Sequence, residues 1–306
     1  MPINKGQQKP GVKKAPEFFR LKRGLNDISA IHGIPALDYG DFNFPDKMSN
    51  IDSLKYARNQ LKNNSYFDNE LPIFFGGDHS CSLATVSAFL DRKNCDDYCV
   101  IWIDAHADCN TFETSPSGNL HGMPVAGLLG KLPEEYSDFK CLASNQVFLF
   151  GIRDVDPGEW DFIEKHGLSY SSMAEIKEKG LSFSLDKMAN FINGRKVYIS
   201  WDIDAMEPDL VSSTGTPVEN GFSFNDMCRI IDLLSCQDVR GLDVVEFNPD
   251  IGDARVTYVT ILKVLDHFCK ALKKSYLFSH SVELNTCLQE LKIFFILNYV
   301  KIFSNL

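Results

Sequence analysis

The chain has 306 residues, of which 44% are hydrophobic and 24% are charged, a composition typical of a globular protein with a substantial core. Its formal net charge of -10 at pH 7 argues against the basic face that a nucleic-acid backbone requires. The nine cysteines show no C-x-x-C spacing and the chain starts without an apolar signal segment, so we expect a cytoplasmic protein rather than a disulfide-stapled secreted one.

The first predicted elements are a polar, turn-rich surface loop over residues 5–16 and a helix from about Pro16 to Leu25. Five short apolar runs follow, and each is succeeded by a segment of helical character. Nearly continuous apolar strands are typical of a parallel sheet that is covered on both faces. The expected strands lie within 71–80, 98–108, 147–156, 196–206 and 239–250, and the expected helices run from Ser82 to Leu90, Gly158 to His166, Ser184 to Ile192, Phe224 to Leu234 and Tyr258 to Ala271.

This alternation predicts a single α/β domain with an open, mostly parallel sheet and helices on both faces. The last apolar run, from Ile293 to Val300, is far shorter than the ~20 residues that span a bilayer. We therefore interpret it as a packed terminal helix or strand and expect no membrane partner.

Acidic and imidazole groups cluster at the carboxyl end of each expected strand, which is the edge where open α/β sheets bind ligands. Asp104, His106 and Asp108 alternate along one run, and Asp202 and Asp204 alternate along another, so we expect each set to share a face. His79 ends a third run, after two glycines. The candidate metal ligands are therefore His79, Asp104, His106, Asp108, Asp202 and Asp204.

A single aspartate or histidine at a strand end is usually a helix cap or a structural residue. Six such groups at matched positions are different, because crowded carboxylates repel one another unless a cation compensates them. Six ligands exceed one tetrahedral zinc site but suit two divalent ions that share carboxylates, and oxygen and imidazole donors favour Mn²⁺. Such a pair can lower the pKa of a shared water towards ~7, which predicts a hydrolase.

Three motifs carry a family resemblance. "GGDHS" (76–80), "DAHAD" (104–108) and "SWDIDAMEP" (200–208) resemble the signatures of the ureohydrolase family. The segments "NTFETSPSGNLHGMPV" (110–125), "GIRDVDPGE" (151–159), "TGTPVENG" (214–221) and "GLDVVEFNP" (241–249) look like those of arginases. The resemblance runs from about Lys5 to Ala271, so it implies an arginase-like three-layer domain over 1–271 and an atypical tail over 272–306.

The resemblance implies two Mn²⁺ ions per subunit. One would bind His79, Asp104, Asp108 and Asp202, and the other Asp104, His106, Asp202 and Asp204. A hydroxide bridging them would attack the guanidinium carbon of L-arginine and yield L-ornithine and urea.

The resemblance also implies roles for residues around the metals. Asp108 would relay the proton of the hydroxide, and His121 would shuttle protons and serve the departing amine. Glu246 would bind the guanidinium, although an internal salt bridge to Arg153 is the alternative. The implied substrate contacts are Asn110, Ser117 and, more weakly, Ser115 for the α-carboxylate, Asp156 for the α-amino group, Glu159 through water, and Thr216 for the guanidinium.

Without the resemblance, the substrate-contact residues would be read as ordinary loop, turn and helix-capping residues. Two other functions compete with arginase activity: a ureohydrolase acting on agmatine or another guanidino compound, and a catalytically dead metal-binding homologue. Ala107, Glu207 and Ser212 depart from the arginase pattern. None of the three is a candidate ligand, so we expect them to tune metal affinity rather than to abolish activity.

The two ends of the chain also depart from the family. Arginases begin with a hydrophobic strand inside the sheet that leads into the "KGQ" loop, whereas "MPINKGQ" keeps at most its last residues. The expectation is a shortened first strand, or another segment in its place. Arginases are typically trimers or hexamers, so the resemblance implies some homo-oligomer, with a number that the unusual tail leaves open.

Overall fold

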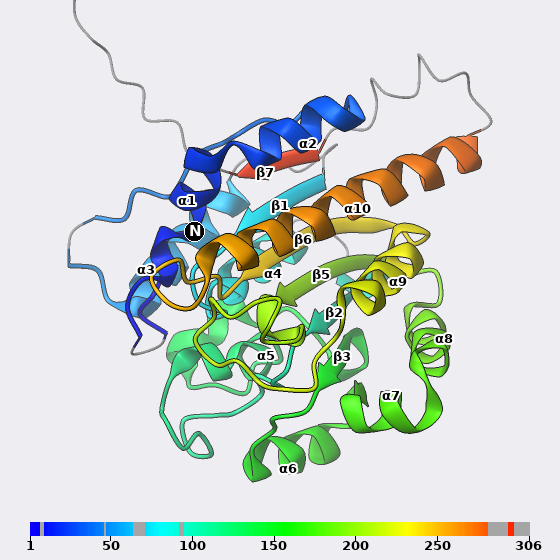
Figure 1. The fold of residues 1–306 in the computed structure, drawn as a ribbon. Coiled ribbons are helices and arrows are strands. Elements are labelled where there is room, and N and C mark those ends of the chain that lie inside the picture. The colour runs from blue at the N-terminus through cyan, green and yellow to red at the C-terminus, as the bar shows by residue number, and fades with distance from the viewer. Residues whose placement is uncertain (7–8, 46, 64–70, 92–94, 281–292, 297–306) are drawn as a thin grey trace, which may run out of the picture.

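The computed structural model describes residues 1–6, 9–45, 47–63, 71–91, 95–280 and 293–296 (Figure 1). Over these residues seven strands form one sheet in the order β4-β3-β2-β5-β6-β1-β7, and every pairing is parallel. This confirms the predicted open α/β sheet. The strands are β1 (Leu71–Phe75), β2 (Tyr98–Ile103), β3 (Val147–Ile152), β4 (Ser169–Ser172), β5 (Lys196–Asp202), β6 (Val239–Val245) and β7 (Ile293–Ile296).

Helices cover both faces of the sheet, and the two sides of each central strand therefore pack into different cores. In β2, Cys99, Ile101 and Ile103 pack on one side, and Tyr98, Val100 and Trp102 pack on the other. The first core includes α1 (Ala15–Lys22), α2 (Gly24–His32), α7 (Met173–Lys179), α8 (Leu181–Ile192), α9 (Phe224–Ser235) and α10 (Ala254–His280). The second includes α3 (Asn50–Lys62), α4 (Cys81–Asp91), α5 (Pro124–Leu128) and α6 (Pro157–His166).

The five predicted strands start where the apolar runs start but end several residues before the predicted ends. β1, β2 and β6 stop where buried apolar residues give way to glycine or polar residues, and β5 includes Asp202 but not Asp204, so most of the polar residues lie in turns beyond the sheet. β4 was not predicted, because "SYSS" is short, polar and only partly buried. It pairs with β3 at one edge of the sheet.

The prediction of one helix up to Leu25 is wrong at its end. Arg23 has a left-handed backbone (φ 56°) and separates α1 from α2. A side chain at Gly24 would meet Leu262 of α10, since a Cβ there would lie 2.2 Å from a leucine methyl carbon. The break therefore lets α2 approach α10 closely.

The end of the described chain adds to the same sheet. β7 pairs with β1 from Leu71 opposite Ile293 to Phe74 opposite Ile296, and Figure 1 shows it between β1 and the helices α1 and α2. The apolar tail run is thus a strand over four residues, and its remainder, 297–300, lies outside the described residues. α10 continues through residue 271 as far as His280. Among the described residues no helix is long and apolar enough to cross a membrane.

Candidate metal centre and pocket

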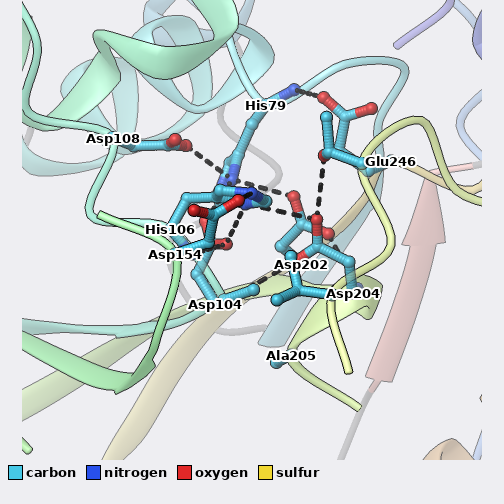
Figure 2. A network of polar contacts seen from close by, with 12 residues as sticks. His79, Asp104, His106, Asp108, Asp154, Asp202, Asp204, Ala205 and Glu246 are labelled. Carbon is cyan, nitrogen blue, oxygen red and sulfur yellow. Dashed lines mark hydrogen bonds and ion pairs between the residues drawn. The ribbon is translucent and has the colours of Figure 1, made fainter. Parts of the chain in front are cut away.

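The parallel arrangement brings the carboxyl ends of β1, β2, β5 and β6 to one edge of the sheet, where the six predicted ligands lie. Asp202 is the last residue of β5 and Asp104 follows β2, while His79 lies in the loop between β1 and α4. Figure 2 shows these side chains pointing towards one another. Strand order thus gathers groups that are more than a hundred residues apart in sequence.

The first cluster centres on His79. Its Nδ1 atom lies 3.0 Å from Asp104 Oδ2, 3.0 Å from Asp108 Oδ2 and 3.3 Å from Asp202 Oδ2. All four residues are buried. Three carboxylate oxygens and one imidazole nitrogen therefore converge on a single point.

The second cluster centres on His106. Its Nδ1 atom lies 3.3 Å from Asp104 Oδ1 and 3.3 Å from Asp204 Oδ2. Because Asp104 turns one oxygen to each histidine, the two clusters share this carboxylate. On the other side of the ring, His106 Nε2 lies 3.7 Å from an oxygen of Asp154.

The aspartates do not converge for the reason predicted. Asp104, His106 and Asp108 are not on one strand, because β2 ends at Ile103 and Asp108 has a left-handed backbone (φ 52°). Instead, Asp104 and Asp202 each accept a hydrogen bond from the backbone N–H two residues later, at 2.8 and 2.9 Å. Each aspartate thereby closes a tight turn that directs the next ligand back to the centre.

Two unpartnered atoms indicate that the clusters suit cations. Within the described part of the chain, His79 Nδ1 and Asp108 Oδ2 are buried and have no hydrogen-bond partner, although the two atoms lie 3.0 Å apart. Burial, with Asp204 and Asp104 nearby, raises the pKa of Asp202 well above its usual range. Burial lowers the pKa of His79, but the three carboxylates outweigh it and raise that pKa. A buried site with this demand for positive charge fits divalent ions.

Glu246 lies beside His121. Glu246 Oε1 accepts a hydrogen bond from His79 N at 2.9 Å and lies 3.2 Å from His121 Nδ1. Burial lowers the pKa of His121, but Glu246, together with Asp108 and Asp78, raises it to about 9. His121 is therefore protonated at neutral pH.

The alternative salt bridge between Glu246 and Arg153 is not what the structure shows. Arg153 follows β3, and its guanidinium donates to carbonyl oxygens of two separate loops. It bonds Asp204 O at 2.7 Å, Val218 O at 2.7 Å and Glu219 O at 3.0 Å. Arg153 therefore holds the segment that carries the ligand Asp204.

A pocket of about 180 Å³ opens beside the two clusters. All six predicted substrate-contact residues line it, and Asn110 Nδ2 donates to Asp156 Oδ2 at 2.8 Å. Glu246 is 1% exposed and is not among the described residues that line the pocket. The lining is His79, His106, Asp108, Asn110, Ser115, Ser117, His121, Gly122, Asp154, Asp156, Glu159, Asp202 and Thr216.

Several pocket residues also have the structural roles that were the alternatives. Glu159 accepts hydrogen bonds from the backbone N–H groups of Cys109 and Asp156, both at 3.0 Å, and so caps the start of α6. Burial and the neighbouring Asp108 raise the pKa of Glu159 to about 8. Thr216 donates to Asp204 Oδ2 at 3.1 Å, so its hydroxyl braces a candidate ligand.

Sequence reasoning missed three residues that contact the candidate ligands. Ser200 Oγ lies 2.8 Å from His79 Nε2, Trp102 Nε1 donates to Asp104 Oδ2 at 3.1 Å, and Asp154 faces His106. Ser200 alternates with Asp202, and Trp102 alternates with Asp104, so strand spacing was the available signal. Ser200 and Trp102 were overlooked because they are neither acidic nor imidazole groups, and Asp154 was overlooked although it is acidic, because it does not alternate with a second candidate ligand.

Comparison with known proteins identifies relatives over most of the chain. Residues 1–270 match the family model described as "Arginase family". Arginase-1 of Rattus norvegicus is 33% identical over 273 residues, which cover 82% of this chain and 84% of that protein. The arginase structure from Bacillus cereus has a TM-score of 0.80 at 27% identity and covers 88% of this chain and 95% of that one. The Entamoeba histolytica arginase in complex with L-ornithine has a TM-score of 0.77 at 26% identity, with 87% and 95% covered.

Proposed function

This chain belongs to the arginase family of metal-dependent ureohydrolases, and we propose that it hydrolyses L-arginine to L-ornithine and urea with two Mn²⁺ ions per subunit. The observation that carries the proposal is the convergence of two histidines and four aspartates beside a pocket that holds every predicted substrate contact. The relative whose structure contains L-ornithine supports the choice of substrate.

The donor set divides naturally between two cations. We propose that His79, Asp104, Asp108 and Asp202 hold one and that Asp104, His106, Asp202 and Asp204 hold the other. When bound, the cations would lower the pKa of a shared water towards about 7 and so supply hydroxide at neutral pH. We assign Asp108 the task of accepting the proton of that water, because its Oδ2 atom is buried and has no hydrogen-bond partner among the residues that the structure describes.

His121 is the proton donor in this proposal. Glu246 faces Nδ1 of its ring, which leaves Nε2 to serve the departing amine. Since Glu246 is engaged with His121 and the His79 backbone, we assign it the task of keeping His121 protonated and oriented. This differs from the guanidinium contact that the family resemblance implied.

The polar end of the pocket would receive the amino-acid end of the substrate. Asn110 and Ser117, with Ser115 beside them, are the proposed α-carboxylate contacts, and Asp156 is the proposed α-amino contact. Ser115 and Ser117 lie on one short loop, where the Ser115 hydroxyl accepts from Gly118 N at 3.0 Å. Contacts at both ends of the substrate favour arginine over agmatine, which lacks the carboxylate.

The test is release of urea from L-arginine and from agmatine by the purified chain, with and without added Mn²⁺, repeated with Asp202→Ala. We expect Mn²⁺-dependent release from arginine and a loss of at least about a hundredfold in the variant, since removing a residue that only supports a metal ligand already costs about 10–100-fold. Release from agmatine alone would reject the proposed substrate but keep the ureohydrolase. Less than one bound ion per chain, with no urea from either compound, would leave a catalytically dead homologue.

A further inference from the structure

A chain of buried hydroxyl groups leads away from the candidate metal centre on the side opposite the pocket. His79 Nε2 lies 2.8 Å from Ser200 Oγ, and Ser200 Oγ lies 3.1 Å from Ser82 Oγ. Ser82 then donates to Asp243 Oδ2 at 2.7 Å. The four residues come from the loop after β1, from β5, from α4 and from β6, and all are buried.

Asp243 is a buried carboxylate whose hydrogen-bond partners among the described residues are hydroxyl groups. Besides Ser82, Thr85 donates to Oδ2 at 2.8 Å and Tyr198 donates to Oδ1 at 2.6 Å. Burial raises the pKa of Asp243, but the three donors oppose that shift and favour the ionised form, because that form offers only lone pairs. The catalytic steps proposed above make no use of this group.

An ionised Asp243 sets the direction of every hydrogen bond in the chain. The one proton of Ser82 is committed to Asp243, so Ser200 must donate to Ser82. The proton of Ser200 is then used, and the remaining contact requires His79 Nε2–H to donate to Ser200. Nε2 therefore carries the hydrogen of the neutral ring, and Nδ1 presents its lone pair to the point where the three carboxylates converge.

We infer that Asp243 is a positioning residue that acts through Ser82 and Ser200 to hold His79 in the tautomer and orientation that bind a cation. The inference rests on the metal centre proposed above. It concerns one of the two cations, because the ligand set around His106 does not include His79. A histidine ligand is commonly fixed in this way by the partner of its other nitrogen, and losing that partner weakens metal binding by about 10–100-fold.

The chain offers a matched experiment, because three hydroxyls bond Asp243 but only one leads to His79. Ser82→Ala interrupts the path, whereas Thr85→Val and Tyr198→Phe each remove a hydrogen bond to the same carboxylate off the path. Mn²⁺ binding to each purified full chain is measured by equilibrium dialysis, and the melting temperature of each metal-free chain is measured beside it. Ser82→Cys, which fills the volume with a weak donor, replaces Ser82→Ala if that variant does not fold.

We expect Ser82→Ala to lower the affinity for one of the two Mn²⁺ ions by about tenfold or more and to change the affinity for the other by less than about threefold. Both control variants should keep the Mn²⁺ affinities of the wild-type chain, even where they lower the melting temperature as much as Ser82→Ala does. Equal loss in all three variants, or no loss in Ser82→Ala, would overturn the inference. The variants could show this pattern of Mn²⁺ affinities while the wild-type chain releases no urea. That result would reject the proposed function and leave the positioning role of Asp243 intact.

Discussion

The protonation of His121 depends mainly on one carboxylate, Glu246, with smaller contributions from Asp108 and Asp78. The folded-state pKa of about 9 lies above the ordinary histidine value of 6.5. The stabilisation from this pair is therefore fully present below pH 6.5 and is lost as the pH rises through about 9. Within that window the protonated ring can act as a general acid.

Glu246→Gln should lower the pKa of His121 from about 9 towards 6.5, because burial lowers that pKa and only Asp108 and Asp78 then oppose it. If the proposed function is right, the upper limb of the pH–kcat profile should move down with it. At pH 8 we expect a loss of about 10–100-fold. An NMR titration of the His121 ring checks the pKa without relying on activity, and an unmoved pKa would show that Glu246 does not control the proton.

Ser117 lies at the rim of the pocket and is exposed, so a charge can be placed there without disturbing the core. Ser117→Asp should raise the KM for L-arginine by about tenfold, since one like-charge contact at a pocket rim costs on the order of 1 kcal/mol. The KM for agmatine, which has no carboxylate, should not rise. Ser137→Asp, at an exposed position of a short 3-10 helix that does not line the pocket, is the control, and steady-state kinetics on both compounds is the measurement.

At the scale of single residues, sequence reasoning identified the groups that meet but not how they meet. Acidic and imidazole residues stand out in apolar surroundings, so His79, Asp104 and Asp202 were recognisable. The turns that orient them depend on backbone N–H contacts and on a left-handed Asp108, which no residue pattern revealed. The pairing of Glu246 with His121 was missed for a related reason, since it joins groups 125 residues apart.

At the scale of elements, Arg153 joins the end of β3 to two loops that follow β5. Arg153→Lys should lower the free energy of unfolding by about 2–3 kcal/mol, because an ammonium cannot reach the same set of carbonyls. It should also weaken metal binding, since the carbonyl of the candidate ligand Asp204 is one of its partners. Denaturant unfolding and Mn²⁺ titration measure the two effects.

Arg195 is a suitable control because it also donates to carbonyl groups, including Asn145 O at 2.8 Å, but it precedes β5, at the opposite end of that strand from Asp202. Arg195→Lys should cost stability and leave Mn²⁺ affinity unchanged. If both variants changed metal affinity alike, or neither did, Arg153 would be an ordinary stabilising residue.

The elements that were predicted and those that were missed differ in their burial. β1, β2, β3 and β5 are continuously buried or nearly so, and apolar runs marked them clearly. β4 is polar and α3 has a weakly apolar face, so neither segment shows a hydrophobic pattern that predicts a strand or a helix. The position of β7 beside β1 is a long-range pairing, which depends on the completed sheet and not on local residues.

At the scale of the whole molecule, the candidate centre places four carboxylates in the interior. Burial and its neighbours raise the pKa of Asp202, so the ionised form costs stability, and stability is lost as the pH rises above the unfolded value of 3.8. Bound cations reverse this cost, because they stabilise only the folded chain. The metal-free and metal-loaded chains should therefore respond in opposite ways to the removal of one charge.

We expect Mn²⁺ at about a hundredfold excess over its dissociation constant to add about 2.7 kcal/mol of stability for each bound ion, or roughly 5 °C in melting temperature for each. Asp202→Asn should raise the melting temperature of the metal-free chain at pH 8 by a few degrees and abolish most of the Mn²⁺ effect, because it relieves repulsion while removing a shared ligand. Asp266→Asn, at an ion pair with His32 outside the centre, should keep the full Mn²⁺ response. Thermal unfolding is measured with a chelator and with Mn²⁺. If metal-free Asp202→Asn melted at a lower temperature than the metal-free wild-type chain, repulsion among the buried carboxylates would not limit the stability of this fold.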